Sequence, residues 1–167
     1  MNFLMISIVV GLIALAVALM LSSAIGKAPA GTARMQEIAG YIHEGAMAFL
    51  FREYKALSAF VIVVAIVISM FLSPLTAVCF VAGAVFSVCA GYIGMTVATK
   101  ANVRTAAAAQ HGGMPEALKI AFSGGAVMGL GVVGLGIVGV AAAYMLFGNI
   151  DIVTGFGLGA SPLALVS

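Results

Sequence analysis

The chain has 167 residues, of which 64% are hydrophobic and 7% charged, with a mean hydropathy of +1.27. Seven basic and five acidic side chains are too few to cover a water-soluble domain of this length, because such domains carry about 25% charged residues; the composition therefore predicts an integral membrane protein. The net charge of +2, with no run of Lys or Arg, argues against a nucleic-acid partner.

Five apolar stretches are candidate membrane spans, because a helix needs about 20 apolar residues to cross a hydrocarbon core of about 30 Å. Their approximate ranges are 3–23, 56–72, 75–98, 120–147 and 152–167. The first is expected to be a retained helix rather than a cleaved signal peptide. The last has no polar end and is expected to be cut short. The predicted fold is an all-α, polytopic transmembrane helix bundle with four complete spans and a truncated fifth, in a single transmembrane region over 1–167.

The segment 35–56 precedes the second span and has two different sides. Apolar residues recur there at helical spacing, and polar residues lie mostly opposite them. These polar residues are Glu37, His43, Glu44, Arg52 and Glu53. We expect their side of the helix to be solvated, and the segment to be either a cytoplasmic extension of the second span or an interfacial lead-in to it.

The fourth span is preceded by Gly112-Gly113 and by Pro115, which suits the first turn of a helix. Within the span, small residues lie near one face, as in Gly125, Gly129, Gly136 and Ala143. Small residues allow membrane helices to approach closely. We expect tight helix packing here rather than a nucleotide-binding motif, which would need a preceding strand.

The basic residues predict the orientation of the chain. All seven lie either between the first and second spans or between the third and fourth: Lys27, Arg34, Arg52, Lys55, Lys100, Arg104 and Lys119. The positive-inside rule makes that side cytoplasmic. We therefore expect an external N-terminus, cytoplasmic loops over 24–55 and 99–119, and a multi-pass location in the cell inner membrane.

The acidic residues do not form a recognisable site in the sequence. They are Glu37, Glu44, Glu53, Glu116 and Asp151. None lies in the middle of a predicted span or at a spacing typical of metal ligands, and no Ser/His/Asp or Cys/His grouping is evident. The sequence therefore predicts no catalytic, metal-binding or substrate-binding residue in this chain.

Four blocks of sequence nevertheless carry a resemblance. Residues 34–55 (RMQEIAGYIHEGAMAFLFREYK), 90–109 (AGYIGMTVATKANVRTAAAA), 117–140 (ALKIAFSGGAVMGLGVVGLGIVGV) and 155–161 (GFGLGAS) resemble the N-terminal region of the membrane-bound, ion-pumping inorganic pyrophosphatases. The resemblance implies a homodimer in the lipid bilayer. It implies that Mg-pyrophosphate is hydrolysed on the cytoplasmic side and that H⁺ or Na⁺ moves outward. The first four helices would belong to an outer ring of helices, and the fifth would open an inner ring.

The same resemblance implies what this chain lacks. Mg²⁺ is the expected cofactor of the complete pump, but the acidic motifs that hold it lie on later helices, so the isolated chain is predicted to be inactive. Ser161 matches a serine of the family and is a weak candidate for the ion path, with packing the favoured role. After Ser161 the sequence departs from the family's pattern at Pro162.

Two alternatives stay open. One is a small non-enzymatic membrane subunit or four-helix transporter, although such a transporter needs a buried carboxylate and none lies inside the predicted complete spans. The other is a remnant that only packs against a full-length partner.

Overall fold

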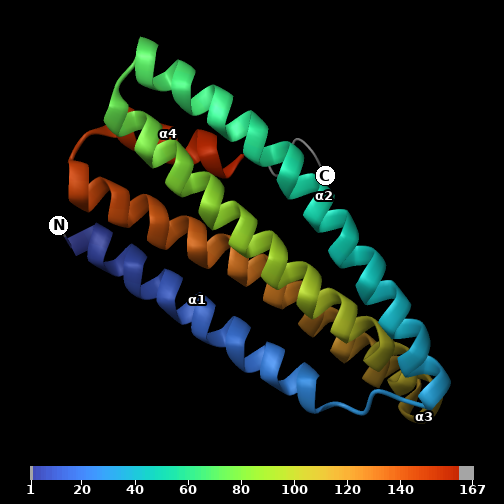
Figure 1. Cartoon of the computed structure of the whole chain (residues 1–167). Helices are drawn as coiled ribbons and strands as arrows, with labels where there is room; N and C mark the ends of the chain where they lie inside the picture. Colours follow the sequence, from blue (N-terminus) through green and yellow to red (C-terminus); the bar gives the residue numbers. More distant parts are fainter. Residues whose placement is uncertain (1, 162–167) are drawn as a thin grey trace.

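The computed structural model describes residues 2–161, and within that range it contains helices and no strand. The elements are α1 (Asn2–Lys27), α2 (Ala33–Phe71), α3 (Pro74–Phe147) and α4 (Ile150–Ala160). The predicted all-α fold is confirmed, and Figure 1 shows the long helices running side by side as a bundle. Residues 162–167, which include Pro162 and the end of the fifth predicted span, lie outside the described range.

Helix α3 folds back on itself at Gly113. This residue has φ 74° and ψ −171°, a non-helical conformation that glycine adopts without a steric penalty. Figure 1 shows the chain reversing direction there, and Val97 and Val127, on either side of the break, pack in one cluster. We call residues 74–112 the first arm of α3 and residues 114–147 the second arm.

Three helices in the described range are long and apolar enough to cross a membrane, namely α1, α2 and α3. Many of their large apolar side chains face outward, with Phe3 86% and Leu146 78% exposed. Apolar surface left in water costs about 25 cal/mol per Å², a cost that a hydrocarbon environment removes. The exposed surface is therefore that of a membrane protein.

Helix α2 joins the segment 35–56 to the second apolar stretch in one continuous helix of 39 residues. At 1.5 Å per residue it is about 58 Å long, more than a hydrocarbon core requires. Of the two sequence interpretations, the helical extension is therefore the one observed. The expected loops 24–55 and 99–119 are corrected accordingly, because both ranges are mostly helical apart from residues 28–32 and the break at Gly113.

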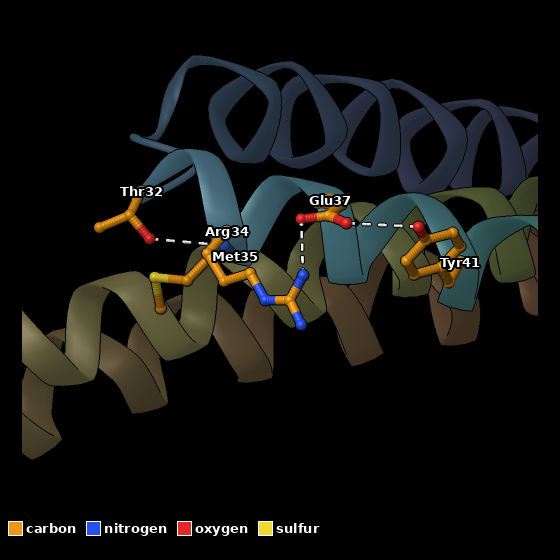
Figure 2. Close-up of polar contacts among 5 residues, drawn as sticks. All are labelled: Thr32, Arg34, Met35, Glu37 and Tyr41. Atoms are coloured by element: carbon orange, nitrogen blue, oxygen red, sulfur yellow. Dashed lines mark hydrogen bonds and ion pairs between the residues drawn. The ribbon is translucent and has the colours of Figure 1, made fainter.

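The start of α2 is fixed by local polar contacts, shown in Figure 2. The Thr32 hydroxyl accepts a hydrogen bond from the Met35 amide at 3.4 Å, which satisfies one of the free amides of the first turn. Arg34 pairs with Glu37 at 2.7 Å, and the Tyr41 hydroxyl donates to the same carboxylate at 3.3 Å. Four of the five polar residues predicted on the solvated side of α2 are exposed, namely Glu37, His43, Glu44 and Arg52.

The other two turns also follow from their residues. The Ser73 hydroxyl accepts from two amides at the start of α3, and Pro74 occupies the first turn, where its missing amide is not needed. Gly148 takes a left-handed conformation with φ 62° at the end of α3, and the Asn149 side chain caps α4.

The helices meet where glycines remove side-chain bulk, but not at the glycines expected from sequence. A Cβ atom on Gly134 would lie 2.9 Å from the Leu15 side chain of α1, and one on Gly139 would overlap the ring of Phe156 in α4. By contrast, a Cβ on Gly125, Gly129 or Gly136 would meet nothing within 4 Å. Among the described residues these three glycines are therefore not packed, whereas Ala143, the fourth small residue predicted on this face, is buried and packs with Cys79 and Phe156.

Candidate functional site

The described residues do not gather a metal site. Between residues 2 and 161, no group of three or more His, Cys, Asp and Glu side chains lies close enough to hold an ion. Mg²⁺ prefers octahedral coordination by oxygen ligands such as carboxylates. The acids of this part of the chain therefore do not fit a magnesium centre.

Ser161 ends α4 and is exposed. The polar contact nearest to it in the chain belongs to Ala160, whose carbonyl accepts a hydrogen bond from the Ser87 hydroxyl at 3.0 Å. This bond joins the end of α4 to the first arm of α3. The role of Ser161 in an ion path or in packing stays a prediction.

Helix α4 lies directly against the backbone of the first arm of α3. A Cβ on Gly83 would overlap the carbonyl oxygen of Phe156, and one on Gly159 would overlap that of Phe80. The Phe86 and Phe156 rings meet edge to face, with centroids 5.6 Å apart. Because glycine has no side chain, the two helices reach backbone contact, and this contact fixes one wall of a groove.

The groove has a volume of about 530 Å³ and lies between α2, both arms of α3, and α4. Its lining is mostly apolar and contains a single carboxylate, Glu53. The lining residues are Phe49, Leu50, Glu53, Phe86, Ser87, Ala90, Gly91, Gly94, Met95, Ala98, Met128, Val132, Leu135, Gly136, Phe156 and Ala160. We call it the Glu53 groove.

Glu53 is buried in this groove, with 8% of its surface exposed. Its Oε1 atom is shielded from solvent and has no hydrogen-bond partner within residues 2–161. A buried polar atom without a partner costs about 1–3 kcal/mol. The sequence expectation that Glu53 lies on a solvated face is therefore wrong.

The sequence did contain a signal for this burial. Leu50 and Leu57 are both buried, and they lie three residues before and four residues after Glu53, which places all three on one side of the helix. The neighbouring cations Arg52 and Lys55, both exposed, made Glu53 look like part of the polar side of the segment.

His43 is exposed, as expected, and it also links α2 to the first arm of α3. Its Nδ1 lies 3.0 Å from the hydroxyl oxygen of Thr99, which is buried. The Thr99 hydroxyl also lies within hydrogen-bond distance of the carbonyls of Met95 and Thr96, at 3.0 and 3.1 Å.

Arg104 closes the C-terminal end of α1. Its guanidinium donates to the carbonyls of Ala28 at 3.1 Å, Gly26 at 3.3 Å and Lys100 at 2.9 Å. The last carbonyls of a helix lack internal partners and carry partial negative charge, so a cation there is favourable. Arg104 also lines a second cavity of about 570 Å³ together with Lys119.

Comparison with known proteins gives a consistent match. The family model described as inorganic H⁺ pyrophosphatase matches residues 12–167. A protein of Clostridium tetani (strain Massachusetts / E88), described as a putative K⁺-stimulated pyrophosphate-energized sodium pump, is 59% identical over 165 residues and matches 98% of this chain.

Two further relatives are described as pumps for two different ions. A K⁺-insensitive pyrophosphate-energized proton pump of Methanosarcina mazei is 45% identical over 157 residues, or 93% of this chain. A K⁺-stimulated pyrophosphate-energized sodium pump of Thermotoga maritima is 41% identical over 163 residues, or 92% of this chain. These matches cover 24%, 23% and 22% of the three relatives, so the chain spans about a quarter of their length.

Proposed function

We propose, from the premise that this chain belongs to the inorganic H⁺ pyrophosphatase family, that it is the N-terminal, outer-ring portion of a pyrophosphate-energized ion pump. The complete pump would hydrolyse Mg-pyrophosphate at the cytoplasmic side of the cell inner membrane and move H⁺ or Na⁺ outward, as a homodimer. The observation that carries this proposal is the family match, which extends over residues 12–167.

The topology proposed for this portion has four complete spans, with α4 as the beginning of a fifth. The two arms of α3 supply the third and fourth spans. Support comes from the contact of Arg104 with the carbonyls of Gly26 and Ala28, which brings the basic end of the first arm of α3 to the end of α1, next to Lys27. Basic residues gathered at one end favour a cytoplasmic position for that end and an external N-terminus.

The role proposed for this portion is to support the catalytic part rather than to supply it. No metal-binding group of acids occurs between residues 2 and 161, so the 167 residues alone are not expected to hydrolyse pyrophosphate. Ion selectivity is also expected to be set elsewhere in the pump. Relatives described as sodium pumps lie both above and below a proton pump in identity to this portion.

The experiment is a chimera with the Clostridium tetani relative. Its quarter that corresponds to this chain is replaced by residues 1–167, and phosphate release and Na⁺ uptake are measured in liposomes with Mg²⁺. We expect both activities in the chimera and neither with the chain alone. A chimera that inserts and dimerises without hydrolysing pyrophosphate contradicts the proposal, and phosphate release by the chain alone contradicts the predicted inactivity.

One observation favours a second candidate, a small membrane transporter without enzymatic activity. Such proteins use a buried carboxylate, and Glu53 is buried. This candidate predicts proton flux through liposomes that contain only residues 1–167, and loss of that flux in Glu53→Gln. Equal flux in both proteins, at the level of empty liposomes, would exclude it.

A further inference from the structure

We propose that the Glu53 groove holds an apolar helix from another part of the pump, and that Glu53 accepts a hydrogen bond from a donor side chain on that helix. This inference rests on the proposed function, because it takes the chain to be one portion of a longer protein. It assigns a partner to the one carboxylate that lines the groove.

The walls of the groove are suited to a helix. Small residues line it on both arms of α3, among them Gly91 and Gly136, and a Cβ on Gly136 would meet nothing within 4 Å. Helices in membranes approach each other most closely over such small residues, because no hydrophobic effect drives their association there. The cavity of about 530 Å³ therefore provides a contact surface that the described helices leave unused.

Glu53 indicates the chemistry of that helix. Its side chain is more than nine-tenths buried, and its Oε1 has no partner within residues 2–161. Lipid chains have no donor to offer, and a polar atom in hydrocarbon is costly until it is paired. A helix carrying Lys, Arg, Ser, Thr, Asn or Gln at the level of Glu53 would supply the missing donor.

The size of the relatives identifies where the helix comes from. This chain corresponds to 24% of the Clostridium tetani relative, so a pump of that length has further segments that can pack against the portion described here. Ala160, at the end of α4, itself lines the groove. In a pump of that length, segments that follow α4 in the sequence would start from the side of the groove that Ala160 lines.

Cross-linking tests where the helix lies. Residues 1–167 are co-expressed with the complementary three quarters of the Clostridium tetani relative, and a photo-reactive benzoylphenylalanine is placed at Val132 or at Val133. The two sites are matched, because they are 49% and 53% exposed, but of the two only Val132 lines the groove.

We expect Val132 to cross-link to one apolar helix of the complementary piece that carries a donor, at several times the yield from Val133 to that same helix. The inference is overturned if Val132 reacts only with lipid, or with a second copy of residues 1–167, while the two pieces co-purify.

Substitution of Glu53 tests the hydrogen bond by the direction in which the unfolding temperature changes. In the assembled pump, Glu53→Leu removes the acceptor of a buried donor, so the unfolding temperature should fall by a few degrees, whereas Glu53→Gln keeps an acceptor oxygen and should lower it less. In residues 1–167 alone, Glu53→Leu removes an unpaired buried polar atom and should raise the unfolding temperature. Glu37→Gln, at an exposed position of the same helix, is the control that should change neither.

The outcomes separate this inference from the proposed function. If Glu53→Leu raises the unfolding temperature in both settings, Glu53 has no donor and the inference fails, even when the wild-type pair hydrolyses pyrophosphate. The opposite result is also possible, in which the wild-type pair does not hydrolyse pyrophosphate but Val132 cross-links to the donor helix. If Glu53→Leu then lowers the unfolding temperature of the assembled pair and raises that of residues 1–167 alone, the inference stands and the proposed function fails.

Discussion

The contact between α4 and the first arm of α3 differs from the groove that both border. In the contact, Gly83 and Gly159 lie against opposing backbone, and the Ser87 hydroxyl donates to the Ala160 carbonyl. In the groove, Gly136 has open space beside it, and Glu53 Oε1 has no partner among residues 2–161.

The difference shows how a finished helix contact can be told from an unfinished one. In a membrane, neither apolar matching nor water can satisfy a polar atom, so packing and hydrogen bonding have to be completed by the same neighbour. In the contact with α4, the glycines and the Ser87 hydroxyl are both occupied. Where both are free together, as at Gly136 and Glu53, we infer that a helix belongs there.

The largest effect is expected in the finished contact. Gly83→Ala or Gly159→Ala places a Cβ against opposing backbone, which cannot move aside as a side chain can, so we expect a loss of about 1–3 kcal/mol of stability. The measurement is thermal unfolding of the chain in detergent. Gly129→Ala, at a position with nothing within 4 Å, is the matched control and should be neutral or slightly stabilising. Equal losses at all three positions would contradict the contrast between occupied and open glycines.

The next effect concerns the opposite end of the bundle. Arg104→Met removes the donors to the Gly26 and Ala28 carbonyls, so we expect the end of α1 to fray at a cost of about 1–2 kcal/mol. Hydrogen exchange of the amides in residues 22–28 should increase. Lys100→Met is the control, because Arg104 contacts only the backbone carbonyl of Lys100, which this change retains. Unchanged exchange in Arg104→Met would show that the cap is dispensable.

Much of the fold could be predicted from the sequence, because each break depends on local chemistry. Pro74, Gly113 and Gly148 mark the reversals at the start of α3, within it and at its end. Each position suits the residue type found there. Arg104 contacts the Ala28 carbonyl just after α1, which agrees with the grouping of the cations in the sequence, and the orientation that they predict stays a prediction.

The candidate site was less predictable, because it depends on which faces of the helices meet. Gly125, Gly129 and Gly136 share a pattern with Gly134 and Gly139, but only the latter two have a neighbouring helix at contact distance. No local rule distinguishes them. Glu53 was misjudged for a similar reason: its exposed neighbours suggested solvent, whereas the groove formed by distant segments buries it.

A smaller effect is expected from the contact between His43 and Thr99, which joins α2 to the first arm of α3 beyond the groove. His43→Ala and Thr99→Val should each lower stability, and the two losses should not add. A double-mutant cycle in detergent should give a coupling of about 0.5–1.5 kcal/mol. Full additivity would mean that the 3.0 Å contact contributes no energy of its own.

The smallest effect is expected at Glu37, which shares α2 with Glu53 but has the opposite environment. Its carboxylate is 47% exposed and pairs with Arg34, itself 73% exposed, as Figure 2 shows. Because water screens such a pair, Glu37→Gln should change stability by less than about 0.5 kcal/mol, and less again at high salt. Urea or thermal unfolding at two salt concentrations measures this. A salt-independent loss above 1 kcal/mol would mean that Glu37 is buried in the assembled protein. The difference in burial between Glu37 and Glu53 would then no longer explain why only Glu53 needs a hydrogen-bond donor from another helix.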